Sequence, residues 1–258
     1  MITSADNKRI KNVIALSTKA KERKAQDAFI IEGPKLFEEA PEDLISEVYV
    51  SESYAGKSPK LDKIPHEVVK DDIFRKMTDT LTPQGILCVV RKSHYDLKSI
   101  LTATAGRAPL FLVLETVQDP GNLGTIMRTA EGAGVSGIIM SRDTVDIYNP
   151  KTVRSTMGSI FRVPFVYTED LKGSISELKA AGVKCYAAHL KGTGSCYDYD
   201  YTAPTAFFIG NEGNGLTEET AALADTYIRI PMGGKLESLN ASISAGVLMY
   251  EAVRQRTR

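Results

Sequence analysis

Short apolar runs alternate with helix-like segments from residue 109 to the end of the chain. The runs stand at 110–115 (LFLVLE), 137–141 (GIIMS), 161–167 (FRVPFVY), 185–190 (CYAAHL), 206–210 (AFFIG) and 227–231 (YIRIP). A continuous apolar run such as LFLVLE is typical of a strand buried on both faces of a sheet. A last helix is expected from near Ser238 to the C-terminus. This alternation predicts an α/β domain whose parallel sheet is covered by helices.

The preceding part of the chain also mixes strands and helices, but over shorter distances. Strands are expected at 29–33 (FIIEG), 47–53 (EVYVSES), 65–70 (PHEVVK) and 85–92 (GILCVVRK). Small residues, a glycine and a proline then gather between 93 and 109, which is typical of a domain junction. We therefore expect a small α/β domain over 1–95, a linker over 96–108 and a second domain over 109–258.

The composition narrows the class of protein. The chain has 258 residues, of which 43% are hydrophobic and 25% charged, and no apolar run approaches the ~20 residues of a membrane span. The N-terminus lacks the apolar core of a secretion signal. Its three cysteines and three histidines have neither the spacing of a zinc site nor that of a disulfide framework. We expect a cytoplasmic protein with no bound metal.

Charge is balanced over the whole chain but not along it. The net charge is zero, yet residues 1–24 carry seven basic side chains against Asp6 and Glu22. Such a patch is suited to phosphate contacts, although a solvated helix face is the more common explanation of such a patch taken alone. Four of these side chains, Lys8, Arg9, Lys11 and Arg23, are the candidates for such phosphate contacts.

Three polar or glycine-rich loops follow predicted strands, where open α/β sheets bind their ligands. The first, 115–134 (ETVQDPGNLGTIMRTAEGAG), places Asn122 as the expected helix cap and Arg128 two turns into the helix. The second, 209–216 (IGNEGNGL), has three glycines in a spacing that differs from the dinucleotide and phosphate-loop patterns. The third, 228–246, places Ser238 and Asn240 at the start of the last helix. Taken singly, each loop is equally well explained by capping or turning.

The three loops together, in this order, resemble the three sequence motifs of the SpoU (TrmH) family of SPOUT RNA methyltransferases. The resemblance covers about 108–258 and includes the linking segment NPKTVRSTMGSIFRVP. A looser likeness, through NKRIKNVIAL and FIIEGPKLFEEA, relates the N-terminal region to the substrate-binding domain often found ahead of the catalytic one.

Membership of this family implies a fold and a reaction. It implies a deep trefoil knot in the catalytic domain, which general folding rules disfavour. It also implies transfer of a methyl group from S-adenosylmethionine to a ribose 2′-hydroxyl of RNA. The cofactor residues carried over from the motifs and their apolar neighbours are Leu190, Gly192, Ile209, Gly210, Asn211, Gly213, Ile230, Met232 and Leu239. The catalytic set is Arg128, Asn122, Glu212, Ser238 and Asn240.

Arg128 is given the role of activating the hydroxyl in the family. Because an arginine side chain stays protonated in proteins, we interpret it as an orienting and charge-stabilising group, with a nearby phosphate as a possible proton acceptor. The resemblance also implies a homodimer. It favours contact of Lys8, Arg9, Lys11 and Arg23 with the RNA backbone, which gives affinity without sequence choice. The added N-terminal domain favours ribosomal RNA as the substrate, by analogy alone.

Other functions stay open at this point. Within the same reaction class, transfer RNA is an alternative substrate. The enzyme could equally be an rRNA methyltransferase whose product confers antibiotic resistance. A catalytically inactive RNA-binding protein is a second alternative, although Asn122, Arg128, Glu212 and Asn240 are all present. A nicotinamide-dependent oxidoreductase would have the same α/β architecture, but this sequence lacks the glycine pattern expected of that class.

Overall fold

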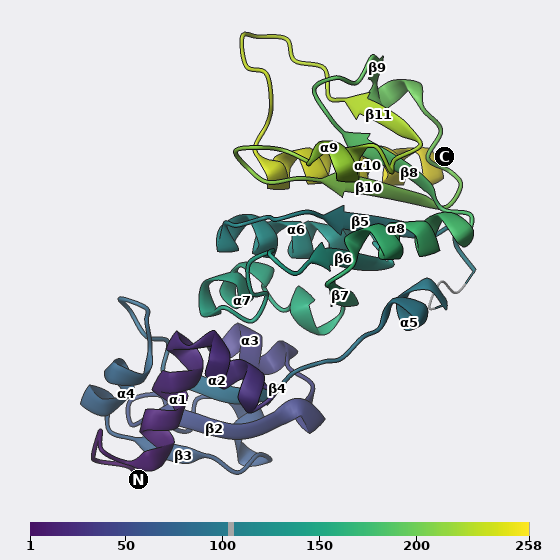
Figure 1. Ribbon diagram of the computed structural model, residues 1–258. Helices are drawn as coiled ribbons and strands as arrows, with labels where there is room; N and C mark the ends of the chain where they lie inside the picture. The colour runs from purple at the N-terminus through teal and green to yellow at the C-terminus, as the bar shows by residue number, and fades with distance from the viewer. Residues whose placement is uncertain (103–105, 258) are drawn as a thin grey trace. The chain divides into compact units, whose positions relative to one another are not determined.

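The computed structural model describes residues 1–102 and 106–257. Its contacts divide the chain into two compact units, each coloured by residue number in Figure 1. Unit 1 contains Met1–Ser93 and Asp146–Phe161, and unit 2 contains His94–Val145 and Arg162–Arg258. The segment 146–161 therefore packs with the N-terminal part of the chain, although it lies between two strands of unit 2 in sequence.

Unit 1 is built on a four-stranded mixed sheet in the order β1-β4-β2-β3. The strands are β1 (Ala28–Glu32), β2 (Ile45–Ser51), β3 (Glu67–Val69) and β4 (Ile86–Arg91). Strand β4 pairs antiparallel with β1 and β2, and β3 pairs parallel with β2. The helices of this unit are α1 (Lys8–Thr18), α2 (Ala20–Ala25), α3 (Pro34–Glu39), α4 (Asp71–Met77) and α7 (Pro150–Thr156).

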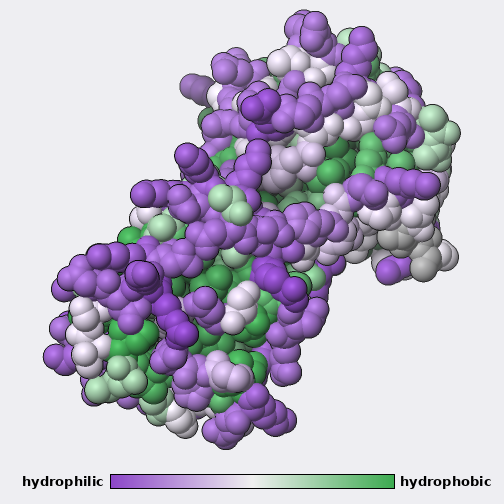
Figure 2. Space-filling model, turned by 60° about the horizontal axis from the view of Figure 1, so that its bottom comes forward, coloured by the Kyte–Doolittle hydropathy of each residue, from purple (hydrophilic) through white to green (hydrophobic). Residues whose placement is uncertain are grey.

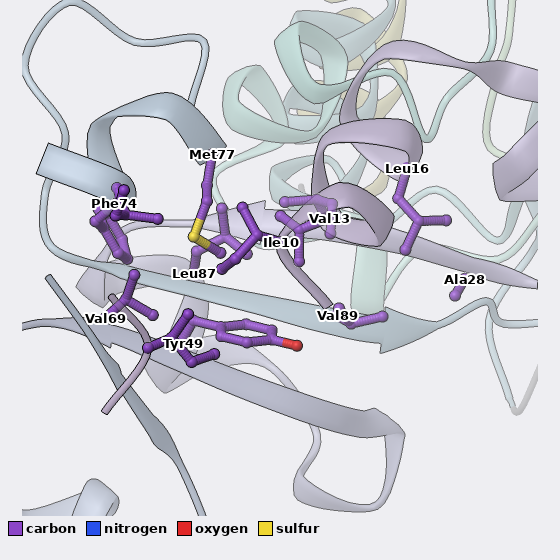
Figure 3. Close-up of a cluster of buried hydrophobic side chains, with 13 residues drawn as sticks. Ile10, Val13, Leu16, Ala28, Tyr49, Val69, Phe74, Met77, Leu87 and Val89 are labelled. Atoms are coloured by element: carbon purple, nitrogen blue, oxygen red, sulfur yellow. The ribbon is translucent and has the colours of Figure 1, made fainter. Parts of the chain in front are cut away.

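Helix α1 forms because its apolar residues recur at helical spacing. Ile10, Val13 and Leu16 are completely buried, and Figure 3 shows them gathered with Leu87 and Val89 of β4. Asn7 caps the helix by accepting a hydrogen bond from the Arg9 N–H, 2.9 Å away. Some of the basic residues of the N-terminal segment thus lie on the solvent-facing side of a packed amphipathic helix.

A buried ion pair holds the segment 146–161 against the N-terminal part of unit 1. The Arg23 side chain is 4% exposed, and its Nε and Nη2 donate to Oδ2 of Asp146 at 2.9 and 2.8 Å. Its Nη1 donates to the Leu16 carbonyl at 2.9 Å. The Tyr148 ring packs 4.7 Å from the ring of Phe29 on β1, measured between centroids. Charge pairing and aromatic packing therefore hold the same segment.

Unit 2 is built on a seven-stranded parallel sheet in the order β7-β6-β5-β10-β8-β11-β9. The strands are β5 (Leu110–Leu114), β6 (Gly137–Ser141), β7 (Phe165–Thr168), β8 (Lys184–Ala188), β9 (Gly194–Ser195), β10 (Thr205–Ile209) and β11 (Thr226–Arg229). The helices are α5 (Leu97–Thr102), α6 (Pro120–Gly132), α8 (Leu171–Ala180), α9 (Glu218–Ala221) and α10 (Ala241–Arg256). Strand β10 lies between β5 and β8, which both precede it in the chain.

Alternate residues of the central strands face different helices. Ala206 and Phe208 of β10 share a buried cluster with Ile175 and Leu178 of α8. The residues of β10 that alternate with these two point toward α10, which also packs along α6. The sheet is thus covered on both faces, which explains why its strands are continuous apolar runs.

The predicted α/β class and parallel sheet are confirmed, and the predicted apolar runs form strands of the two sheets, most with bounds within two residues of those expected. The run 161–167 is the exception, because Phe161 ends a 3-10 helix and the strand β7 begins only at Phe165. The segment expected to be a linker contains α5, whose Ile100 is buried in the core of unit 2; residues 103–105 of that segment lie outside the described residues. The trefoil knot stays a prediction. Hydrophilic residues cover most of the face shown in Figure 2, and among the described residues no helix has the length and apolar character needed to cross a membrane.

The Arg23–Asp146 pair generates a stability prediction. Replacing Asp146 by alanine leaves a buried guanidinium without its counter-charge, so we expect unit 1 to lose about 3 kcal/mol of stability. Hydrogen exchange of the β1 and β4 amides measures this loss locally. The matched control is Glu169→Ala, which breaks an ion pair with Arg142 whose side chains are 75% and 71% exposed and should cost at most ~1 kcal/mol. Equal effects of the two variants would contradict the prediction.

Candidate active site

A cavity of about 230 Å³ opens in unit 2 where the carboxyl ends of β8, β10 and β11 meet the start of α10. These three strands end at Ala188, Ile209 and Arg229. The loops that follow them supply most of the lining. This is the position at which open parallel sheets bind ligands.

The cavity brings together most of the residues that the sequence motifs single out for the cofactor. Its lining includes Leu190, Ile209, Gly210, Asn211, Gly213, Ile230, Met232 and Leu239. Gly192 is not part of the lining; its Cα lies against the backbone of β11, where a Cβ would come within 2.8 Å of the Ile228 carbonyl carbon. Gly192 therefore allows the loop after β8 to pass close to β11.

The glycine-rich loop after β10 is folded tightly against itself. A Cβ on Gly210 would lie 2.1 Å from the carbonyl carbon of Gly215, so only glycine allows this approach. Asn211 and Gly215 exchange backbone hydrogen bonds of 2.9 Å. The Asn211 side chain accepts from the N–H groups of Gly213 and Asn214 and donates to the Thr116 carbonyl at 2.9 Å. Asn211 thus shapes the loop and ties it to the end of β5.

Glu212 joins the same loop to the β5–α6 connection. Its carboxylate accepts from the backbone N–H groups of Gln118 and Asp119, both at 3.0 Å, and from Nδ2 of Asn122 at 2.9 Å. Partial burial raises the pKa of Glu212, but these hydrogen bonds outweigh it and hold the pKa below its ordinary value. Glu212 is therefore a fixed, ionised acceptor.

The hydrogen-bond chain continues from Asn122 to the last helix. Asn240 donates from Nδ2 to Oδ1 of Asn122 at 3.0 Å, while its own Oδ1 accepts from Ser242 and Ile243 and caps α10. The expectation that Asn122 caps α6 is wrong. Asp119 is the cap and accepts from the Asn122 N–H at 2.8 Å. This arrangement frees the Asn122 side chain to bridge Glu212 and Asn240.

Glu115 completes the framework, and sequence reasoning missed it. This buried carboxylate ends the apolar run of β5. It accepts from the N–H of Thr217 at 2.7 Å, from the Thr217 hydroxyl at 2.8 Å and from the Thr220 hydroxyl. Its only sequence signal was an acidic residue adjoining a fully apolar strand. Glu115 holds the far end of the loop whose near end is held by Asn211 and Glu212.

Two residues of the predicted catalytic set lie outside this network. Arg128 is exposed on α6, and its guanidinium has no hydrogen-bond or ion-pair partner among the described residues. Ser238 is exposed and lines the cavity at its α10 side. The structure thus unites Asn122, Glu212 and Asn240, places Ser238 at the cavity, and leaves Arg128 free.

The chemistry of the site is that of carboxylates, amides and backbone groups. Within residues 1–102 and 106–257, no cluster of His, Cys, Asp and Glu could hold a metal ion. The three cysteines are all buried, and burial raises the pKa of Cys185 to about 12. None of the three is therefore suited to act as a thiolate nucleophile.

The basic residues singled out for RNA contact lie in unit 1 and differ in availability. Lys8, Arg9 and Lys11 are exposed on α1, where Arg9 pairs with Glu67 at 2.6 Å and Lys11 with Asp6 at 2.9 Å. Such exposed pairs are weak and can exchange for phosphate. Arg23 is buried and its donors are occupied. We therefore withdraw Arg23 from the RNA-contact set and assign it to the packing of unit 1.

Comparison with known proteins identifies a family for each of two parts of the chain. The family model described as the SpoU rRNA Methylase family matches residues 109–250, and the MRM3-like substrate binding domain matches residues 7–88. The chain is 36% identical to the 23S rRNA (guanosine(2553)-2′-O)-methyltransferase RlmP of Bacillus subtilis, over 96% of this chain and 97% of that protein.

Solved structures resemble the whole chain. The SpoU methyltransferase AviRb from Streptomyces viridochromogenes, in complex with the cofactor AdoMet, aligns with a TM-score of 0.84 and 28% identity, over 97% of this chain and 98% of that one. An AdoMet-bound rRNA methyltransferase from Sinorhizobium meliloti aligns with a TM-score of 0.83 and 34% identity, over 98% and 97%. The chain belongs to the SpoU rRNA methylase family.

Proposed function

We propose that the chain transfers a methyl group from S-adenosylmethionine to a ribose 2′-hydroxyl of ribosomal RNA. The observation that carries this proposal is the hydrogen-bonded chain from Glu212 through Asn122 to Asn240, which joins all three motif loops beside one cavity. Two of the proteins described above, from Bacillus subtilis and Sinorhizobium meliloti, are named as methyltransferases of rRNA, which favours rRNA over tRNA as the substrate. A ribosomal substrate would place the enzyme in the cytoplasm.

The cavity suits the cofactor by the chemistry of its walls. Leu190, Ile230 and Leu239 provide apolar surface for a flat heteroaromatic ring, and the folded backbone of the glycine loop offers hydrogen-bonding groups at its edge. Arg229 and Glu237 also line the cavity, and neither has an ion-pair partner among the described residues, so both signs of charge are available to a zwitterionic group. When bound, S-adenosylmethionine supplies an activated methyl group.

The remaining tasks belong to the protein's own residues. Glu212, Asn122 and Asn240 fix the loops, so that bound groups are held in a defined orientation; such alignment can supply several kcal/mol. Arg128 remains cationic at any working pH. We assign it to orienting the 2′-hydroxyl and stabilising negative charge on that oxygen, with an RNA phosphate accepting the proton.

We further propose that the enzyme is a homodimer and that Arg128 serves the cavity of the partner. On α10, Ile243 and Tyr250 are exposed by 53% and 51%, and their spacing of seven residues puts them on one face. Tyr250 lies over α6, since a Cβ on Gly132 would meet its hydroxyl at 3.0 Å. Arg128 precedes Gly132 by one turn, so it borders this apolar face.

The experiment that tests the reaction is methyl transfer from labelled S-adenosylmethionine to total RNA from a strain lacking the protein, followed by mapping of the label. We expect label in one ribose of rRNA. Label in tRNA would overturn the substrate, and absence of both label and cofactor binding would overturn the reaction itself.

The control for this experiment is Arg128→Ala. Loss of a charge-stabilising group should lower kcat by about 10²-fold or more while calorimetry shows unchanged cofactor affinity, because Arg128 is absent from the cavity lining. Arg128→Lys should recover part of the rate. Near-normal turnover of the alanine variant would exclude Arg128 from the chemistry.

Glu212 generates a prediction on cofactor binding and pH. Its depressed pKa means that the carboxylate is fully ionised above the ordinary glutamate range, and its contribution is lost only as the pH falls through the lowered value. Cofactor affinity should therefore show no Glu212 titration between about pH 5 and 8. Glu212→Gln should weaken binding about tenfold or more at every pH, because the amide cannot accept all three hydrogen bonds. Wild-type affinity of this variant in calorimetry would contradict the role.

The dimer proposal predicts two outcomes. Ile243→Glu should be monomeric in light scattering at micromolar concentration, whereas the control Lys172→Glu, on exposed α8 surface, should not. Mixing Arg128→Ala with Glu212→Gln chains should restore roughly a quarter of wild-type activity if Arg128 acts across a two-fold interface. A monomeric wild type would contradict the dimer, and a dimer without restored activity would place Arg128 in its own chain's site.

A further inference from the structure

A second cavity, of about 320 Å³, lies in unit 1 at the carboxyl end of β2. Its lining residues belong to none of the sequence motifs. Its walls come from the end of β2, the loop after it, helix α4 and the segment before β4. The lining residues are Ser51, Ser53, Tyr54, Lys57, Asp71, Phe74, Arg75, Pro83, Gln84 and Gly85.

The framework of this cavity is rigidly built. Ser51 is buried and its N–H donates to the Gly85 carbonyl at 2.8 Å. Gly85 has a φ of 84°, and a Cβ there would lie 2.6 Å from Cβ of Tyr54. Both the backbone conformation and the lack of space therefore require glycine at this position. Asp71 accepts from the Ser53 N–H at 3.1 Å, which fixes the loop to α4. Phe74 is buried beneath it.

Three polar side chains around this framework, Lys57, Arg75 and Gln84, make few or no hydrogen bonds among the described residues. Lys57 and Arg75 are exposed. The Lys57 ammonium and the Gln84 carboxamide have no partner among the described residues, and Arg75 uses only Nε, in a bond of 3.4 Å to the Asp71 carbonyl of its own helix. Two free cations, a free amide and an aromatic side chain thus surround one cavity. An acidic acceptor, Asp71, lies beside them.

This mixture of groups selects its ligand. A bare phosphate would meet two cations but also the carboxylate of Asp71. A nucleotide satisfies both, since its phosphates are acceptors and its 2′-hydroxyl and base N–H groups are donors. Tyr54 adds an aromatic surface of the kind on which unpaired bases stack. Bases in a duplex are not free to enter such a cavity.

We propose that the cavity of unit 1 binds one unpaired ribonucleotide of the RNA substrate, with Lys57 and Arg75 holding its phosphates. The proposal rests on the proposed function, since it takes RNA as the substrate, and it locates the recognition of single-stranded RNA in unit 1. The α1 residues Lys8 and Lys11 then supply general attraction, because exposed lysines contact phosphate without selecting the nucleotide.

The test is fluorescence anisotropy of the full chain with a labelled single-stranded oligouridylate, compared with a blunt RNA duplex and with the deoxy oligonucleotide. Wild type should prefer the single-stranded RNA. Lys57→Ala/Arg75→Ala should weaken its binding about tenfold and lower the slope of log K against log salt by about 1.4, the value for two phosphate contacts on a single strand. Ser53→Trp should weaken binding by filling the cavity, although it removes no charge.

The matched control is Lys8→Ala/Lys11→Ala, which removes the same charge from α1. Equal losses in the two double variants, or full binding by Ser53→Trp, would overturn the cavity as the site. Hydrogen exchange confirms that each variant is folded, and S-adenosylmethionine calorimetry shows that unit 2 is intact. Failure of wild type to bind single-stranded RNA would also overturn the site, while the methyl-transfer experiment decides the proposed function separately.

Discussion

The candidate active site depends on one carboxylate. Glu212 is the point at which the glycine loop after β10, the β5–α6 connection and, through Asn122, the start of α10 are joined. Two of its three donors are backbone N–H groups, so the interaction fixes the path of the main chain as well as side-chain positions. Hydrogen bonds to a charged acceptor are worth about 1.5–3 kcal/mol each, and leaving such donors unpaired would cost a similar amount. The loops that line the cavity are therefore coupled to the ionisation of a single group.

The position of β10 in the sheet makes this coupling possible. Because β10 lies between β5 and β8, its carboxyl end emerges beside that of β5. Glu115 and Glu212 then hold the glycine loop near its two ends. Glu115 accepts a hydrogen bond from the Thr217 N–H, and Glu212 accepts one from the Asp119 N–H. Partners about 90 to 100 residues apart in sequence are brought together by strand order. A loop with three glycines would otherwise be costly to order, and these anchors restrict it without occupying the space that a ligand needs.

Sequence patterns predicted the parts of this fold that depend on local or one-dimensional information. Buried parallel strands are apolar throughout, so strands could be predicted directly at 110–115 and 206–210. The order of the three motifs identified Asn122, Glu212 and Asn240 together. Patterns failed where a residue chooses among partners distant in sequence. Asp119 and Asn122 are both good caps, and only the presence of Glu212 and Asn240 shows why Asp119 takes the cap. The expected linker likewise contains a helix because Ile100 finds a core that the sequence does not display. The packing of 146–161 with unit 1 could not be predicted, since its main contact is between Arg23 and Asp146.

Basic residues illustrate why charge alone is a poor guide to function. Arg23 lies in the most basic segment of the chain, yet its guanidinium is buried and fully engaged. Lys57 and Arg75 lie outside the sequence motifs and Arg128 lies within one, yet the charged groups of all three lack a carboxylate partner among the described residues. A buried paired cation stabilises the protein and cannot be withdrawn without leaving a charge unpaired. An exposed unpaired cation gains nothing for the fold and is available to an anionic ligand. Burial and pairing together therefore separate the structural Arg23 from the exposed arginines that can act on RNA, and they do so independently of position in the sequence.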